Sequence, residues 1–257
     1  MVMRGHPWAE KAIWLPTVNS TNTHAAMLAK QGAPHGTVVL ADQQTAGKGR
    51  LGRKFSSPAG KGIYCSVVLR YDLQPERLFS LTPIMAEAAR QAVAAVTGVQ
   101  PQIKWINDLV LHGRKLCGIL TELGTENGAV SYVIVGIGIN CSQQEEDFPP
   151  ELRYTAISLQ QALGKSVDRE AVALELIRRV QLAADGFPEN AASWMKTYVN
   201  HCLTIGKDVQ LIRNGETREA HVDGVDERGA LLVTLPDGTK ETVFSGEASV
   251  RGLNGYI

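Results

Sequence analysis

The sequence lacks the features that mark several broad classes of protein. Its four cysteines stand far apart and fall into no Cys-x-x-Cys, His-Glu-x-x-His or similar metal-binding spacing. We therefore expect buried, reduced thiols, with no structural metal and no bound redox cofactor. No apolar run approaches the length of a membrane span, and residues 1–7 contain no signal-peptide core. These absences predict a cytoplasmic protein that does not enter a membrane.

Net charge and a nucleophile motif are also missing. The 257 residues include 26 lysines and arginines against 26 aspartates and glutamates, so no overall field attracts nucleic acid or anionic lipid. No Gly-x-Ser-x-Gly pattern marks an activated serine. The chain is long enough for one large domain and a small appendage, and its 44% apolar content supplies a sizeable core.

The sequence does contain one concentrated basic stretch, residues 47–55, which we call the basic loop. Its cations are Lys48, Arg50, Arg53 and Lys54, set among three glycines that allow the backbone to approach a ligand closely. The stretch spells G-x-G-x-x-G, but residues 56–62 have loop composition where a dinucleotide-binding fingerprint requires a helix. It is not a Walker loop either. The pattern predicts a loop that closes over a phosphate-bearing ligand, or else a solvated hairpin tip.

The remaining sequence alternates between strand and helix patterns up to about residue 203. Expected strands cover residues 12–15, 37–41, 63–69, 115–123 and 130–139, and expected helices lie within 22–32, 75–97, 168–180 and 191–199. Pro16 is expected to end the first strand. From Gly206 onward, short strands separated by Asn-Gly, Arg-Gly and Asp-Gly turns predict a small all-β unit. We expect a mixed α/β domain over residues 1–203 and a β appendage over 204–257.

Five segments carry a family resemblance. They are Asn-Ser-Thr-Asn at 19–22, the basic loop, Lys-Trp-Ile-Asn-Asp at 104–108 with Lys-Leu-Cys-Gly-Ile-Leu at 115–120, Gly-Ile-Gly-Ile-Asn at 136–140, and Gly-Glu-Ala-Ser-Val-Arg at 246–251. Together, and in this order, they resemble the biotin protein ligases. The resemblance implies a mixed, largely antiparallel sheet with helices, followed by a small SH3-like β-barrel.

The resemblance also implies a reaction. Biotin and ATP, with Mg²⁺, form biotinyl-5′-adenylate and release pyrophosphate, and a lysine of a biotin carboxyl carrier protein, part of acetyl-CoA or pyruvate carboxylase, then accepts the biotin. No covalent enzyme intermediate is needed, in agreement with the missing nucleophile motif. No winged helix-turn-helix precedes residue 12. The chain therefore resembles the ligase-only form, from which we expect no DNA binding. A homodimer is possible.

Residue roles implied by the resemblance fall into three groups. The groups that bind biotin are Ser20, Thr21, Asn22, Gln44, Lys48, Gly49, Arg50, Lys115, Gly118, Gly136 and Gly138. The groups that bind ATP or the adenylate are Arg50, Arg53, Phe55, Asn107 and Asn140. Catalysis is assigned to Lys115, Arg50 and Asp108, and Asp108 is the candidate ligand for Mg²⁺. Helix capping is the alternative for Ser20 and Thr21, a turn position for Asp108, and an exposed turn lysine for Lys115.

Three positions depart from the family pattern. Lys48 stands where arginine is usual, Phe55 replaces a tryptophan, and Ile106 replaces a proline. Phe55 offers less area for stacking on adenine. Two other functions stay open on the sequence: a lipoate ligase or octanoyl transferase of the same catalytic fold, and a sensor that binds biotinyl-adenylate without catalysis.

Overall fold

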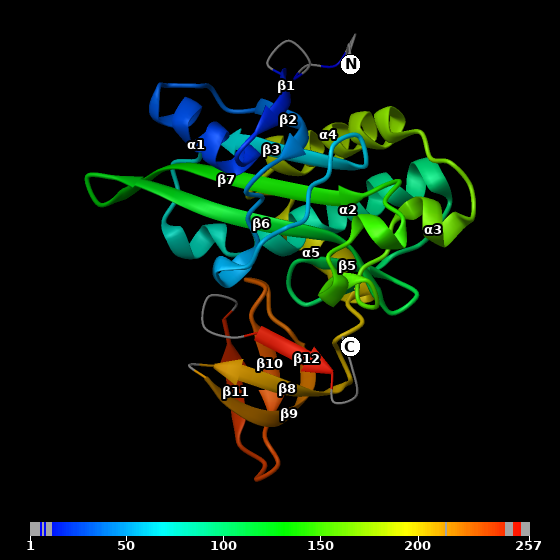
Figure 1. Ribbon diagram of the computed structural model, residues 1–257. Helices are drawn as coiled ribbons and strands as arrows, with labels where there is room; N and C mark the ends of the chain where they lie inside the picture. Colours follow the sequence, from blue (N-terminus) through cyan, green and yellow to red (C-terminus); the bar gives the residue numbers. More distant parts are fainter. Residues whose placement is uncertain (1–5, 7, 9–11, 214, 245–248, 253–257) are drawn as a thin grey trace.

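A computed structural model describes residues 6, 8, 12–213, 215–244 and 249–252, and its main body is a seven-stranded mixed sheet (Figure 1). The strands are β1 (Ala12–Val18), β2 (Thr37–Gln44), β3 (Gly62–Leu69), β4 (Gln102–Lys104), β5 (Asp108–Leu111), β6 (Arg114–Glu126) and β7 (Ala129–Asn140). Their order across the sheet is β1-β2-β3-β7-β6-β5-β4. Only the β1–β2 pair is parallel among these neighbours. The predicted mixed, largely antiparallel sheet is confirmed.

The expected end of the first strand was wrong. β1 continues through Pro16 to Val18 and stays in register with β2 on both sides of the proline, pairing Leu15 with Ala41 and Thr17 with Gln43. The reason is position in the sheet. β1 is an edge strand, where alternate backbone N–H groups face away from the neighbouring strand, so a residue without an N–H is tolerated.

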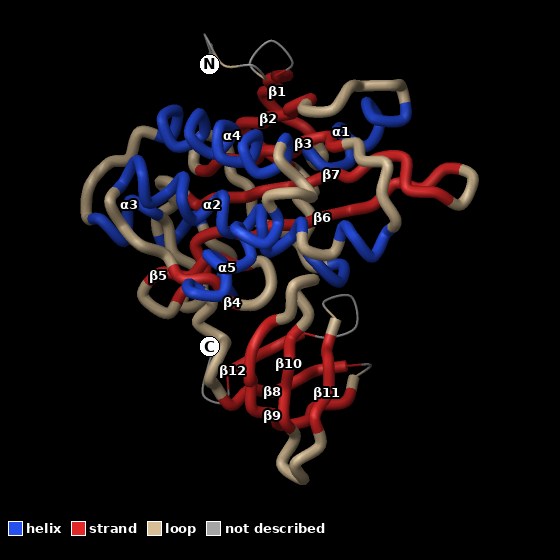
Figure 2. The backbone as a smooth tube through the Cα atoms, turned by 180° about the vertical axis from the view of Figure 1, so that it is seen from behind, coloured by secondary structure: helices blue, strands red, loops and turns tan. Residues whose placement is uncertain are grey.

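Helices cover both faces of the sheet. On one face lies α1 (Thr21–Lys30), whose Ala25 and Ala29 pack on Val39, Val68 and Ile134. The opposite face carries α2 (Leu81–Thr97), α4 (Arg169–Asp185) and α5 (Ala191–His201), with the short α3 (Leu159–Leu163) beside them (Figure 2). Strand side chains alternate between the two faces of a sheet. Because both faces are covered by helices, β2 and β3 have continuous apolar runs instead of alternating ones.

Sequence signals at the helix ends account for their positions. Asp168 caps α4 as predicted, its carboxylate accepting a hydrogen bond from the Ala171 N–H at 2.9 Å. Pro83 lies in the first turn of α2, where the missing N–H is not needed for the helix. The cysteines Cys65, Cys117, Cys141 and Cys202 are free and buried, as expected. Within the described residues, no helix has the length and apolar character to cross a bilayer.

The C-terminal part is a separate five-stranded antiparallel sheet, ordered β11-β10-β9-β8-β12. Its strands are β8 (Asp208–Arg213), β9 (Glu216–Val225), β10 (Leu231–Thr234), β11 (Lys240–Val243) and β12 (Ser249–Gly252). The predicted turn glycines Gly215, Gly229 and Gly238 all have positive φ. Asn214 of the first turn and residues 246–248 of the fifth motif lie outside the described residues.

The Trp105 side chain of the large domain contacts the small sheet. Its indole Nε1 donates to the Gly229 carbonyl at 2.9 Å, and its backbone N–H donates to Thr204 Oγ1 at 2.9 Å. Gly229 is closely packed there: a Cβ at this position would lie 2.9 Å from Pro83 Cγ. The small sheet is therefore attached beside the 104–108 segment. The division of the chain at residues 203 and 204 stays a prediction.

Candidate active site

A cavity of about 600 Å³ opens on the face of the sheet beside the basic loop. The basic loop and the start of α1 form part of its wall, and β6 and β7 form its floor. Every residue assigned a role from the sequence lines this one cavity: Ser20, Thr21, Asn22, Gln44, Lys48, Gly49, Arg50, Arg53, Phe55, Asn107, Asp108, Lys115, Gly118, Gly136, Gly138 and Asn140. The fold therefore gathers residues that are 120 positions apart in the sequence, Ser20 and Asn140, around one space.

One end of the cavity is polar and neutral. Gln44, at the end of β2, accepts hydrogen bonds at Oε1 from the Thr21 backbone N–H at 2.8 Å and from Thr21 Oγ1 at 3.1 Å. Its Nε2 donates to Ser57 Oγ at 2.8 Å, which fixes the orientation of the amide. Ser20 occupies the N-cap position of α1, yet its side chain makes no capping bond. Its hydroxyl is therefore not committed to the helix, although capping was the alternative reading of this residue.

Glycines on the floor make room for side chains from other segments. A Cβ at Gly136 would overlap the Asn22 amide, and a Cβ at Gly138 would lie 2.5 Å from the Phe55 ring. Phe55 also approaches Gly118, where a Cβ would be 3.5 Å from the ring. Glycine inside a strand commonly marks the close approach of another group, and the glycines of β6 and β7 at the cavity floor follow that rule. The approaching groups in this structure are side chains of the protein, and Phe55 lies against the floor.

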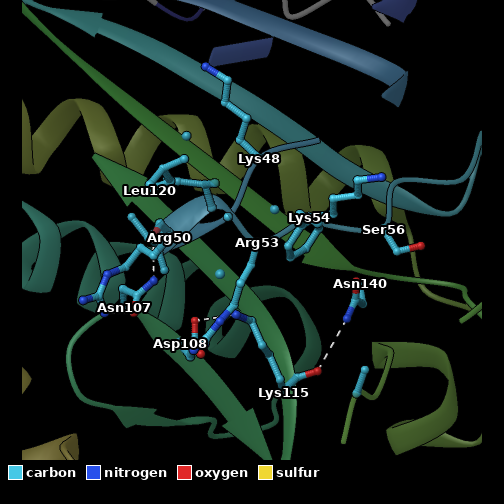
Figure 3. Close-up of a pocket in the computed structure, with 18 of the residues that line it drawn as sticks. Lys48, Arg50, Arg53, Lys54, Ser56, Asn107, Asp108, Lys115, Leu120 and Asn140 are labelled. Atoms are coloured by element: carbon cyan, nitrogen blue, oxygen red, sulfur yellow. Dashed lines mark hydrogen bonds and ion pairs between the residues drawn. The ribbon is translucent and has the colours of Figure 1, made fainter. Parts of the chain in front are cut away.

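The other end of the cavity is charged. Lys115 Nζ lies 2.7 Å from Asp108 Oδ1, with the two side chains 30% and 16% exposed. Arg50 reaches from the basic loop and donates to Asn107 Oδ1 at 3.1 Å, while Asn107 Nδ2 donates to the Ile119 carbonyl at 2.7 Å. Burial lowers the pKa of the Arg50 guanidinium, and the nearby Asp108 carboxylate acts in the opposite direction. Figure 3 shows Lys115 extending toward Asp108.

The basic loop divides its cations between two directions. Lys48 points away from the Asp108–Lys115 pair (Figure 3), and its Nζ lies 3.5 Å from Glu122 Oε1. The loop is closed on itself by backbone bonds, from Gly49 N–H to the Arg53 carbonyl at 2.7 Å and from Phe55 N–H to the Gly47 carbonyl at 2.9 Å. It therefore forms a small hairpin whose tip is a 3-10 turn at Arg50–Gly52.

Asn140 ends β7 and is 4% exposed. Its Nδ2 donates to the Ile157 carbonyl at 3.1 Å and approaches the Lys115 carbonyl at 3.5 Å, and its Oδ1 accepts from Gln143 Nε2 at 3.1 Å. Asn140 thus ties the start of β6 to the 155–157 segment. A contact of Asn140 with adenine stays a prediction.

Sequence reasoning missed two further cations of the charged end. Lys104 lies in the Lys-Trp-Ile-Asn-Asp motif and Arg251 in the fifth motif, but neither was given a role. Burial lowers the pKa of Lys104 to about 8, with Asp108 opposing that shift and Lys115 and Arg251 adding to it. Both residues lie inside motifs that resemble the family, and this position in the sequence could have indicated a role for them. Arg251 also shows that the small C-terminal sheet contributes directly to the cavity.

The carboxylates near the cavity limit how the site can hold a metal ion. The described part of the chain contains no cluster of three or more His, Cys, Asp or Glu side chains placed to hold an ion. Mg²⁺ in nucleotide sites is commonly held by one or two carboxylates together with substrate phosphates. Asp108 supplies one carboxylate at the cavity wall. One carboxylate at the wall fits an ion whose remaining ligands are the phosphates of a nucleotide.

Comparison with known proteins decides the family. Residues 14–140 match the biotin/lipoate A/B protein ligase family, and residues 204–251 match the biotin protein ligase C terminal domain. The bifunctional ligase/repressor BirA of Bacillus spizizenii is 38% identical over 91% of this chain and 72% of its own length. This chain belongs to the biotin protein ligase family. The biotin–[acetyl-CoA-carboxylase] ligase of Paracoccus denitrificans is 32% identical over 90% of this chain and 100% of its own length.

A solved structure agrees with this assignment. The biotin protein ligase of Aquifex aeolicus, in complex with biotin and ATP, superimposes with a TM-score of 0.79 at 31% identity, over 94% of this chain and 98% of the other. The family and the α/β fold with a C-terminal antiparallel sheet, both expected from the sequence motifs, are confirmed. The cavity of this biotin protein ligase has a polar, neutral end and a cationic end. The role of each lining residue follows from the end at which it lies.

Proposed function

We propose that this biotin protein ligase uses the neutral end of its cavity for biotin and the charged end for ATP. A biotin carboxylate oxygen attacks the α-phosphorus of ATP, forming biotinyl-5′-adenylate as pyrophosphate leaves. The amine of a carrier-protein lysine then attacks the biotinyl carbonyl, forming an amide as AMP leaves. The single observation that supports this division is that one cavity brings a hydrogen-bonding end and a cationic end together.

At the neutral end, Ser20, Thr21 and Gln44 are placed to bind the ureido ring. A urea presents a carbonyl acceptor and two N–H donors, so it needs neighbours that can donate and accept. Hydroxyl and amide groups meet both needs without charge. The Ser20 hydroxyl is not used for helix capping, and Thr21 and Gln44 are held in place by each other. Gly136 and Gly138 have no side chains, which leaves space above β7 for the ureido ring and for the Asn22 and Phe55 side chains.

At the charged end, two anions must approach each other. The biotin carboxylate and the triphosphate repel, and fixed cations in a partly buried site lower that cost. At this end, Lys115 is held by Asp108 at 2.7 Å, so its ammonium is positioned before substrate arrives. Arg50 and Arg53 of the basic loop would bind the phosphate side of the adenylate, where a guanidinium suits anionic oxygens.

Lys104 and Arg251 extend the cationic region beyond the basic loop. Both line the cavity and interact electrostatically with one another. We place the departing pyrophosphate beside them, because it is the more highly charged of the two products of adenylation. Mg²⁺, held by Asp108 and the phosphates, would neutralise part of that charge. The nucleotide would be bound by the remaining polar and aromatic side chains, Asn107, Phe55 and Asn140.

A docking edge for the carrier protein lies beside the cavity. β5 pairs with β6 at residues 114–118, so the second half of β6 has β7 on one side and no described strand on the other. β6 and β7 extend past the sheet as a long hairpin in Figure 1. An unpaired strand edge can accept another strand. The carrier domain would add there, and a second copy of this chain would use the same edge in a homodimer.

The test is ATP-dependent transfer with two labelled acids. Labelled biotin should be joined to a biotin carboxyl carrier domain, with pyrophosphate released beforehand, whereas labelled lipoate should not be transferred. Transfer of lipoate at a matching rate would favour the lipoate ligase alternative. Biotin-adenylate binding without pyrophosphate release would instead identify a sensor.

A further inference from the structure

Glu122 lies outside the residues that line the cavity, yet it contacts two segments that form the wall. It stands on β6, and its Oε2 accepts a hydrogen bond from Asn22 Nδ2 at 2.7 Å. Its Oε1 lies 3.5 Å from Lys48 Nζ in the basic loop. The Lys48 and Glu122 side chains are 46% and 40% exposed, so solvent screens that ion pair and it contributes little. The bond to Asn22 is the stronger contact, because it is short, charge-assisted and reaches a buried residue.

Glu122 decides which way the Asn22 amide is turned. The amide nitrogen faces the Glu122 carboxylate at 2.7 Å and the Leu120 carbonyl at 3.4 Å, and both of these groups only accept hydrogen bonds. The amide oxygen must therefore point the other way, where Ser66 Oγ lies at 2.6 Å. Gly136 leaves room for the Asn22 amide in this orientation, because a Cβ at residue 136 would overlap it.

The fixed amide in turn orders the hydroxyl groups behind the cavity wall. Ser66 Oγ lies 2.6 Å from Asn22 Oδ1 and 2.7 Å from Thr21 Oγ1, but it has a single hydrogen. Because an amide oxygen cannot donate, that hydrogen goes to Asn22. Thr21 Oγ1 therefore receives none from Ser66. Its own hydrogen goes to one of two acceptors within the protein, Ser66 Oγ or Gln44 Oε1 at 3.1 Å.

The result is a wall that accepts hydrogen bonds. Thr21 lines the cavity with oxygen lone pairs that no described donor fills, beside the acceptor oxygen of Gln44. A ligand N–H satisfies such a wall, whereas a ligand oxygen at the same place meets the lone pairs of Thr21 Oγ1. Among ligand groups, a cyclic urea carries two N–H donors. The preference rests on the proposed biotin-binding role of this end of the cavity.

We propose that Glu122 is a positioning residue for ligand recognition: it orients Asn22 and, through Ser66, makes Thr21 an acceptor for a urea N–H. The carboxylate does not touch the ligand. Its effect passes along the chain of contacts from Glu122 to Asn22, Ser66 and Thr21. Removal of the acceptor at residue 122 releases the amide to turn over, and the hydroxyl order behind the wall is then lost.

The first experiment compares Glu122→Leu with Glu122→Gln in biotin-dependent pyrophosphate release. Leucine removes the acceptor, so the KM for biotin should rise by about 10-fold or more, with kcat and the KM for ATP within about threefold of wild type. Glutamine keeps an oxygen for Asn22 and loses the exposed ion pair and the charge assistance of the bond, so its KM for biotin should stay within about threefold of wild type. Equal losses in both variants, or none in either, would overturn the proposal.

A second readout measures the hydrogen-bond preference itself. Two biotin analogues, each with one urea N–H replaced by oxygen, are compared with biotin. The wild-type enzyme should discriminate against at least one analogue by about 100-fold, and Glu122→Leu should narrow that ratio about 10-fold because Thr21 can then donate. A purely structural role for Glu122 would weaken all three ligands alike, and an unchanged ratio would refute the mechanism.

An exchanged pair keeps the test independent of how Glu122→Leu folds. Asn22→Asp alone places two carboxylates together and should weaken biotin binding by about 10-fold or more. Combining Asn22→Asp with Glu122→Gln restores one donor and one acceptor, and the Ser66 hydrogen still finds an oxygen. Biotin KM should then recover by about 10-fold relative to Asn22→Asp, and no recovery would contradict the proposal. Wild-type enzyme that released no pyrophosphate with biotin would instead refute the proposed function.

Discussion

The two ends of the cavity, built on the same sheet, differ in how their side chains are held when no ligand is bound. At the neutral end, Thr21 and Gln44 bond to each other, and Asn22 is bonded by Glu122 and Ser66, so the wall is ordered before any ligand arrives. At the charged end, Lys115 and Arg251 both repel the charged form of Lys104, and Asp108 offsets part of that repulsion. The side chains of the first end are held in place without a ligand, whereas the cations of the second end are stabilised by an anion.

This difference explains how specificity and catalysis can be separated. An ordered neutral wall rejects a ligand with the wrong hydrogen-bonding pattern, because buried polar groups would be left unpaired. A cluster of cations binds any suitable phosphate, and its contribution grows as charge develops in the transition state. Substitutions at the neutral end should therefore act on biotin alone, and those at the charged end on ATP or on kcat.

The largest effect is expected from Lys115→Ala. Lys115 is held by Asp108 at the charged end, so its loss should lower kcat for adenylation by about 10²- to 10³-fold, the scale of one electrostatic contact in an active site. Pyrophosphate release at saturating biotin and ATP measures it. Lys165→Ala, an exposed lysine between α3 and α4, is the matched control and should keep full activity. Near-normal adenylation in a folded Lys115→Ala variant would remove this lysine from the mechanism.

A smaller effect, confined to biotin, is expected from Thr21→Val. The substitution keeps the shape of the side chain and removes the hydroxyl, so the KM for biotin should rise about 10- to 100-fold while the KM for ATP changes little. Thr23→Val on the same helix is the control, because Thr23 does not line the cavity. A parallel rise in the KM for ATP would break the division between the two ends.

Arg251→Ala should show the complementary pattern. It removes one exposed cation contributed by the small C-terminal sheet, and the KM for ATP should rise about 10-fold with biotin affinity unchanged. Arg218→Ala, which breaks an exposed ion pair with Glu241 on the same sheet, is the control. If both variants behave like wild type, the small sheet takes no part in nucleotide binding.

The smallest effect is a pH dependence assigned to Lys104. Burial lowers its pKa to about 8, so the free enzyme carries this charge below pH 8 and loses it above. Bound phosphate favours the protonated form. The kcat/KM for ATP should therefore fall severalfold as pH rises through about 8, while kcat at saturating ATP stays flatter. Lys104→Met should remove this step, and a step that persists in the variant must come from another group.

The sequence predicted the members of the site better than their surroundings. Lys115 was identified through the family resemblance of its Lys-Leu-Cys-Gly-Ile-Leu segment, and Gly138 through the resemblance of Gly-Ile-Gly-Ile-Asn. Glu122 was missed because an acidic residue in a strand has no pattern that reveals its partner, Asn22, one hundred positions away. Pro16 misled for a related reason: the sequence shows a proline, but only the sheet order shows that it lies on an edge strand.

Lys104 and Arg251 illustrate the same limit at the charged end. Both sit inside quoted motifs, yet their roles depend on how a separate sheet is attached, and that depends on contacts such as Trp105 with Gly229. Local patterns predict strands, turns and caps. They do not predict which cations from distant segments come to share one cavity.

The most direct measurement of the central claim is pyrophosphate release, followed in one assay with biotin and ATP varied independently across wild type, Thr21→Val and Arg251→Ala. The division of the cavity predicts biotin-dependent release in the wild type, a raised KM for biotin alone in Thr21→Val, and a raised KM for ATP alone in Arg251→Ala. If either variant shifts both constants together, or if the wild type releases no pyrophosphate with biotin, the account is wrong.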